Sequence, residues 1–129
     1  MSSLSSAAPH AVILFAHGAR DPQWAEPFRR IREQVSLQRP GVKVELAFLE
    51  LMTPDLSQCV HELAQGGVRQ MTLVPLFMAQ GGHLKKDLPP MVSELEKAHP
   101  GLRIHVTPAI GESAALLSAI ASWVVQQSS

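Results

Sequence analysis

The amino-acid sequence predicts a single α/β domain with three layers, in which a four-stranded parallel sheet lies between helices on both faces. Short apolar runs alternate with longer amphipathic segments four times along the chain, as in strand–helix units that build a parallel sheet. Two of the runs are continuous and two alternate with polar residues, which separates buried central strands from half-exposed edge strands. With 129 residues, the chain can bury one core without a disulfide or a structural metal.

The composition excludes several classes of protein. The formal net charge is zero and the basic residues are scattered, so nothing indicates a nucleic-acid partner. The single cysteine, Cys59, excludes an internal disulfide and a cluster of thiolate ligands. No apolar run approaches membrane-span length, and residues 1–9 lack the basic start and apolar centre of a signal peptide. We expect a cytoplasmic protein without a membrane partner, with a disordered tail over 1–9 and one domain over 10–129.

The first half of the chain contains a central strand, a helix and an edge strand. Residues 11–16 are continuously apolar, which indicates a strand covered on both faces. A helix should start near Pro27, because proline is tolerated in the first turn. Residues 42–48 alternate between apolar and polar, as edge strands do. The apolar face of the helix comprises Trp24, Phe28, Ile31 and Val35.

A second helix should follow, with Thr53 as its cap and Pro54 in its first turn. Residues 71–74 form the third strand, and Pro75 marks its end because proline cannot donate to a ladder. A third helix has apolar residues at helical spacing over 88–95, and 102–106 alternate like an edge strand. The last helix carries Leu116, Leu117, Ile120, Trp123 and Val124.

The strand pattern also predicts the topology of the sheet. The first and third strands read as central, and the second and fourth as edges. This burial pattern fits the spatial order 2-1-3-4, a flavodoxin-like arrangement.

The connection after the third strand differs from an ordinary strand-to-helix loop, which is short and polar. It begins with Leu76, Phe77 and Met78, continues to Gly81 and Gly82, and ends in His83. The apolar start suggests a surface that meets an apolar molecule or a neighbouring subunit. The two glycines should let the backbone turn sharply before His83.

Three candidate ligands or proton carriers follow three successive strands. His17, Glu50 and His83 are 33 residues apart each time, about one strand–helix unit. Because the carboxyl ends of parallel strands lie at one edge of the sheet, these side chains should converge there. Two imidazoles and a carboxylate suit a divalent ion such as cobalt, nickel, iron or zinc, and equally suit acid–base chemistry. We interpret the remaining histidines as structural or exposed, with His10 in the tail.

The motifs together resemble those of a known family. The segments Val12-Ile-Leu-Phe-Ala-His17-Gly-Ala-Arg20, Phe48-Leu-Glu50-Leu and Pro75-Leu-Phe, with Gly-Gly-His83 and Asp87-Leu-Pro89, are similar to the short CbiX-type sirohydrochlorin chelatases. The resemblance covers nearly the whole chain after the tail. It implies the class II chelatase fold and insertion of a divalent metal, most often cobalt but also iron or nickel, into sirohydrochlorin for cobalamin or siroheme. One departure is Ala19, where the family commonly has serine.

The resemblance also implies roles for individual residues. His17 and His83 match the paired catalytic histidines, and Glu50 joins them as the acidic position of the metal site. The metal is a substrate, so no tightly bound cofactor is expected, and the short form should be a homodimer with the tetrapyrrole cleft between two copies. Substrate contacts are expected from Arg20, Leu76, Phe77, Met78, Gly81, Gly82 and Lys85.

Two alternatives stay open from the sequence. A metal- or tetrapyrrole-binding protein without turnover would need the same histidines. A phosphoryl-transfer enzyme using His17 and Arg20 is less consistent with the sequence, because no glycine-rich phosphate cradle accompanies them.

Overall fold

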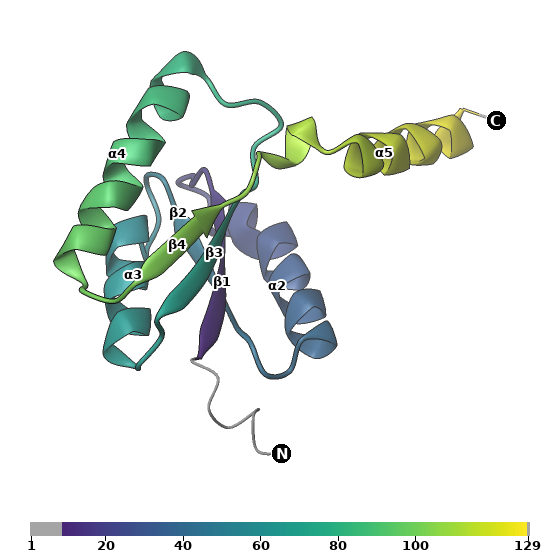
Figure 1. Ribbon diagram of the computed structural model, residues 1–129. Helices are drawn as coiled ribbons and strands as arrows, with labels where there is room; N and C mark the ends of the chain where they lie inside the picture. The colour runs from purple at the N-terminus through teal and green to yellow at the C-terminus, as the bar shows by residue number, and fades with distance from the viewer. Residues whose placement is uncertain (1–8, 129) are drawn as a thin grey trace.

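The structure, a computed structural model, describes residues 9–128 (Figure 1). The predicted tail over 1–9 therefore lies, apart from Pro9, outside the described residues. The elements in chain order are β1 His10–Ala16, η1 Pro22–Ala25, α2 Glu26–Gln38, β2 Lys43–Phe48, α3 Leu56–Gln65, β3 Gln70–Pro75, α4 Gly82–Ala98, β4 Arg103–Val106, η2 Ile110–Glu112 and α5 Ala114–Gln127.

The sheet has the predicted topology. Its four strands are parallel and lie in the order β2-β1-β3-β4. In the register of β1, Ala16 pairs with Phe48 of β2 and Phe15 pairs with Pro75 of β3. The placement of His10 in the tail was wrong, because this residue begins β1 opposite Gln70 and its Nε2 lies 3.0 Å from the Thr72 hydroxyl.

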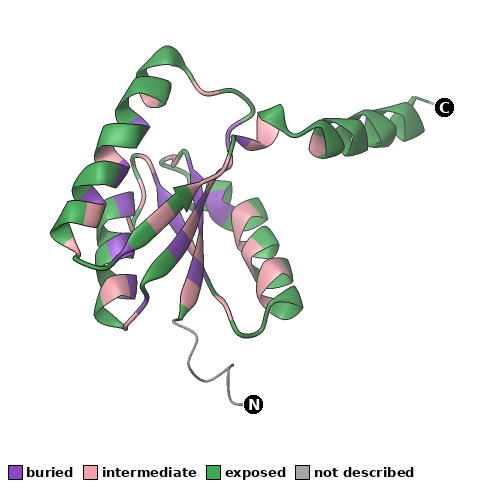
Figure 2. Ribbon diagram, viewed as in Figure 1, coloured by how far each residue is buried: buried purple, intermediate pink, exposed green. Residues whose placement is uncertain are grey.

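Helices cover the two faces of the sheet unequally. The α3 and α4 helices lie on one face and complete a core around Ile13, Phe15 and Leu73 (Figures 1 and 2). On the opposite face, α2 packs against a smaller cluster that includes Leu14 and Leu46. The prediction of helices on both faces is confirmed, although none of the residues of α2 is fully buried.

The start of α3 differs from the prediction. Asp55, not Thr53, caps this helix: its carboxylate accepts a hydrogen bond from the Gln58 amide at 2.8 Å, and the Gln58 side chain accepts one from the Asp55 amide at 2.9 Å. This reciprocal capping box satisfies two amides that the helix itself leaves without partners. The Thr53–Pro54 peptide is cis and belongs to the preceding loop.

The start of α4 is also earlier than predicted. The helix begins at Gly82, and the Lys85 amide donates to the Gly81 carbonyl at 3.1 Å to close its first turn. Pro89 and Pro90 lie inside the helix and are exposed, so water can hydrate the carbonyls that lose their intrahelical donors. His83 therefore lies in the first helical turn and not at the end of a loop.

The last helix, α5, projects away from the rest of the molecule (Figure 1). None of residues 114–127 is buried, although their apolar pattern predicts a covered face (Figure 2). Within residues 9–128, no helix is long and apolar enough to cross a membrane.

Candidate active site

Two of the predicted site residues come from adjacent strands and contact each other. His17 follows β1 directly, Glu50 lies two residues after β2, and the two strands pair in register up to Ala16 and Phe48. The Leu49 amide continues the ladder by donating to the Ala16 carbonyl at 2.8 Å. As a result, His17 Nδ1 lies 2.9 Å from Glu50 Oε1.

Gly18 completes the contact around the Glu50 carboxylate. Its amide donates to Glu50 Oε2 at 2.8 Å, so each oxygen of the carboxylate has a partner. A Cβ atom at position 18 would lie 1.9 Å from the Glu50 carbonyl oxygen, far inside van der Waals contact. Only glycine lets these two loops approach so closely.

The charge on Glu50 decides how the His17 ring is protonated. Burial alone would raise the pKa of Glu50, but the hydrogen bonds from the Gly18 amide and the His17 ring outweigh it and hold that pKa below the ordinary value of 4.5. An ionised carboxylate can only accept hydrogen bonds, so His17 Nδ1 must be the donor. In the neutral ring, Nε2 then carries a lone pair that can accept a proton or bind a metal.

Two aromatic side chains fix the position of His17. The Trp24 indole N–H donates to the His17 carbonyl at 2.7 Å. The buried Phe77 ring packs edge-to-face against the imidazole at a centroid distance of 4.7 Å and against Phe15 at 5.8 Å. Phe77 therefore supports the histidine from the core, which differs from its predicted contact with a substrate.

His17 and His83 line one cavity of about 350 Å³ between the strand ends and α4. Gly81 and Asp87 also line it, together with the apolar side chains of Leu49, Ala79, Leu84 and Met91. Of these residues, Gly81 and the two histidines were predicted from the sequence. Asp87 lies four residues after His83, and its position in the cavity follows from the early start of α4, because residues i and i+4 share a helix face.

The other predicted substrate residues do not meet in this cavity. Leu76 packs with the α2 cluster on the opposite face of the sheet, and Arg20 and Met78 are exposed. Gly82 and Lys85 border a shallow hollow with His83 and Lys86. Neither Gly81 nor Gly82 has a positive φ, and a Cβ atom would meet nothing within 4 Å at either, so the backbone does not require glycine at these positions.

A larger hollow of about 550 Å³ lies on the other side of α4, between this helix and the segment after β4. Lys85 lines it, but His17 and His83 do not. We therefore assign the chemistry to the smaller cavity, where the histidines converge.

The three predicted metal ligands are only partly assembled. Among the described residues, no three His, Cys, Asp or Glu side chains are placed to share one ion. His17 and Glu50 are paired and His83 faces the cavity from α4, so the shared metal site of these three residues stays a prediction.

Comparisons with known proteins give a consistent picture. The CbiX family model matches residues 11–127. A sirohydrochlorin cobaltochelatase of Methanopyrus kandleri is 37% identical over 82 residues, which are 64% of this chain and 57% of that relative. Two further cobaltochelatases are matched over 60% and 62% of their lengths, so this chain spans less than two thirds of these curated relatives.

Solved structures share the fold. A cobalamin (vitamin B12) biosynthesis CbiX protein from Marinobacter aquaeolei has a TM-score of 0.81 and 38% identity, with 92% of this chain and 97% of that chain covered. The sirohydrochlorin chelatase SirB from Bacillus subtilis, in complex with cobalt, has a TM-score of 0.76 over 92% of this chain and 50% of its own. At 21% identity, the second likeness concerns the fold alone.

Proposed function

Because this chain belongs to the CbiX family, we propose that it inserts a divalent metal ion into sirohydrochlorin. Cobalt is the first choice, as in the cobaltochelatases that it resembles, and iron and nickel are the alternatives. The observation that carries the proposal is the His17 ring, which donates through Nδ1 to Glu50 and lines a cavity that His83 also lines. The homodimer and the cytoplasmic location expected from the sequence stay predictions.

His17 acts as a base or as a transient ligand in this proposal. A tetrapyrrole loses two pyrrole protons as the ion enters. One neutral imidazole nitrogen can accept a proton or hold the ion, but cannot do both at once. Once the His17 ring is protonated, the adjacent Glu50 carboxylate stabilises the positive charge. Glu50 is therefore a positioning residue for His17, in addition to its proposed role as a metal ligand.

His83 supplies the second function from the other wall of the cavity. It lies one helical turn before Asp87, which lines the same cavity. Two histidines on different elements allow one to receive protons while the other guides the ion. The apolar side chains of Leu49, Leu84 and Met91 give the macrocycle a wall to rest on. Lys85 and Lys86 lie near His83 at the rim of the cavity, where their positive charges can pair with the carboxylates of the macrocycle.

The test is anaerobic mixing of the purified protein with sirohydrochlorin and Co²⁺, Fe²⁺ or Ni²⁺ in turn, followed by the absorbance of the macrocycle. We expect multiple turnovers with at least one of these ions. His17→Ala and His83→Ala should each lower the rate by about 10²–10⁴-fold, the usual contribution of a general base.

His105→Ala is the matched control, because this exposed histidine lies on β4 outside the cavity. Its rate should equal that of the wild type. A single stoichiometric absorbance change, without turnover, would instead support the non-catalytic binding protein. Turnover that is indifferent to both cavity histidines would place the chemistry elsewhere.

A further inference from the structure

Two histidines outside the active-site cavity contact each other. His61 lies on α3 and His99 ends α4, and His61 Nδ1 lies 3.3 Å from His99 Nε2. The centroids of the two rings are 5.5 Å apart. Because α3 and α4 end where β3 and β4 begin, the pair lies at the amino edge of the parallel sheet (Figure 1). His17 and His83 lie at the opposite edge, where the strands end.

The His99 ring is held in one orientation and one tautomer. Its Nδ1 lies 3.0 Å from the Leu95 carbonyl oxygen, and a carbonyl can only accept, so Nδ1 carries the proton. The lone pair of the neutral ring is then on Nε2, the atom that faces His61. Many metal-binding histidines have this arrangement, in which one nitrogen donates to a backbone carbonyl and the other keeps its lone pair for the ion.

The separation of the two nitrogens fits a shared metal ion. Two nitrogen ligands that are 3.3 Å apart and each about 2.1 Å from a divalent ion would subtend an angle of about 100° at the ion. This angle lies between those of octahedral and tetrahedral coordination. His61 is exposed, so its proton can move to Nε2 through water and leave the Nδ1 lone pair for the ion. Both rings then bind as neutral ligands.

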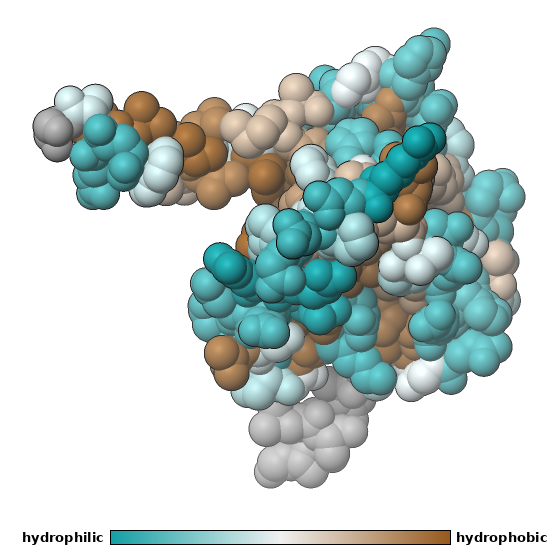
Figure 3. Space-filling view, turned by 180° about the vertical axis from the view of Figure 1, so that it is seen from behind, coloured by the Kyte–Doolittle hydropathy of each residue, from teal (hydrophilic) through white to brown (hydrophobic). Residues whose placement is uncertain are grey.

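The surroundings of the pair suit a cation better than an apolar ligand. The two histidines line a hollow of about 220 Å³ with Ala64, Gln65, Arg69, Ala98 and Pro100. Figure 3 shows hydrophobic residues along the projecting helix α5, which does not line this hollow. The last carbonyls of α3 and α4 give this end of both helices a partial negative charge. Arg69 donates to the Ala64 and Val68 carbonyls at 3.2 and 3.0 Å, which holds its guanidinium at the end of α3.

We propose that His61 and His99 form a second metal site, which binds one divalent ion such as Co²⁺, Ni²⁺ or Zn²⁺ and ties the end of α3 to the end of α4. Imidazole nitrogens select these ions over Mg²⁺, which prefers oxygen ligands. Among the described residues, no third His, Cys, Asp or Glu is placed to join the pair, so water completes the coordination and the ion exchanges with solvent. The site is independent of the proposed chelatase activity.

The test is calorimetric titration of the protein, without a histidine tag, with Co²⁺ and with Zn²⁺. A background protein carries His17→Ala and His83→Ala together, so that the active-site cavity does not contribute. It should bind one equivalent of either ion, and its melting temperature should rise, because an ion that binds only the folded chain stabilises it. Mg²⁺ should produce neither effect.

His61→Ala and His99→Ala, each added to the background protein, should remove the site. Each should weaken binding by at least about tenfold, the loss that even a supporting partner of a metal ligand causes, and should abolish the rise in melting temperature. His61→Gln keeps a side-chain N–H that can donate to His99 Nε2. This variant should therefore fold like the background protein, by circular dichroism, and still lose the ion.

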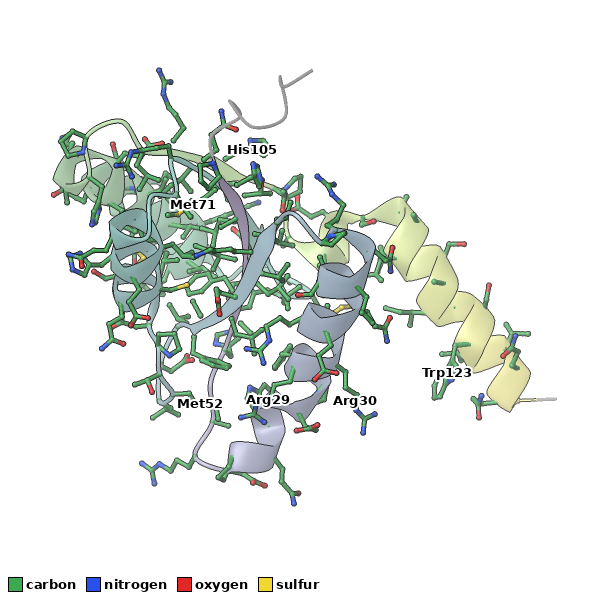
Figure 4. The ribbon with its side chains drawn as sticks, turned by 90° about the horizontal axis from the view of Figure 1, so that it is seen from below. Arg29, Arg30, Met52, Met71, His105 and Trp123 are labelled. Atoms are coloured by element: carbon green, nitrogen blue, oxygen red, sulfur yellow. The ribbon has the colours of Figure 1, made fainter. Side chains whose placement is uncertain are left out.

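His105→Ala is the histidine control. Ile104 and Val106 of β4 pack against the core beneath α3 and α4, so His105 between them faces the other side of the sheet (Figure 4). This variant should bind the ion as the background protein does. A background protein that takes up neither ion would overturn the proposal. Binding that survives both His61→Ala and His99→Ala, or that only one of them weakens, would place the ion elsewhere and would overturn the paired site.

Discussion

At the scale of single residues, the state of His17 is set by what surrounds it. Glu50 accepts a hydrogen bond from Nδ1–H, the Gly18 amide donates to the same carboxylate, and Trp24 and Phe77 restrain the backbone and the ring of His17. A surface histidine without these partners would populate both of its neutral tautomers. Here an acceptor-only carboxylate leaves the Nε2 lone pair available.

Glu50→Gln tests whether this carboxylate positions and supports the histidine. We expect the rate of metal insertion to fall about 10- to 100-fold, as for other groups that orient a ligand or base. Measurement of initial rates beside the wild type at one pH would reveal this loss.

The lowered pKa of Glu50 determines how the stability contributed by the His17–Glu50 pair changes with pH. Because that pKa is below 4.5 in the folded chain, the stabilisation from the pair is fully present above this value and is lost as the pH falls through the lowered pKa. A Glu50→Gln enzyme with the wild-type rate would contradict the positioning role.

Gly18→Ala should disrupt the site through a steric clash. The new methyl group would lie 1.9 Å from the Glu50 carbonyl oxygen, so one of the two loops must move and separate His17 from Glu50. We expect activity to fall at least as far as in Glu50→Gln. Gly41→Ala is the matched control, since a Cβ atom there meets nothing within 4 Å. Equal metal-insertion rates for Gly18→Ala and Gly41→Ala would show that the loops carrying Gly18 and Glu50 can move apart without loss of activity.

At the scale of elements, the strands and the start of α2 near Pro27 could be predicted closely, but the starts of α3 and α4 could not. The apolar runs at 11–16 and 71–74 define buried strands because both faces of a central strand are covered. Thr53-Pro54 and Asp55 both offer a plausible cap, and the sequence pattern does not say which one the tertiary structure uses. The early start of α4 was missed for the same reason, and Asp87 and Leu84 were missed as cavity residues with it.

Asp55→Ala tests the cap that the structure assigns to α3. Loss of the capping box should lower the free energy of unfolding by about 1 kcal/mol, measured by urea denaturation. Thr53→Ala is the comparison, because it alters the residue that sequence reasoning favoured. A larger loss for Thr53→Ala than for Asp55→Ala would contradict the assigned helix start.

At the scale of the whole molecule, the fold class and the strand order follow from hydrophobic patterning, but the exposure of α5 does not. The pattern of α5 indicates an apolar surface that should be covered, and it carries no information on whether its own chain or another provides the cover. Local sequence spacing similarly places His17, Glu50 and His83 at one edge of the sheet. Which of these side chains touch depends on packing between elements.

Cys59 offers a probe of the whole fold, since it is the one cysteine of the chain and is buried. Burial, with smaller contributions from Glu45 and Glu62, raises the pKa of its thiol to about 12. We expect a thiol reagent at pH 8 to label the native protein only as fast as the core opens.

Ser57→Cys provides the control for this labelling, because position 57 is exposed on the same helix. The added thiol should react at once while Cys59 stays protected. As denaturant unfolds the protein, the Cys59 thiol should become reactive, and the midpoint of this labelling should equal the midpoint of the loss of helical structure. Immediate labelling of Cys59 in the native wild type would contradict the burial of α3 against the sheet.

The pairing of β1 with β2 has a consequence for how this protein can change over time. A shift of one residue between the strands would turn every side chain to the wrong face of the sheet and would also separate His17 from Glu50. Natural selection on solubility and folding therefore protects the alignment of the histidine without acting on activity. Ala79 and Gly81 line the cavity outside this register, so mutations at these two positions can diversify what the cavity admits while its base stays in place.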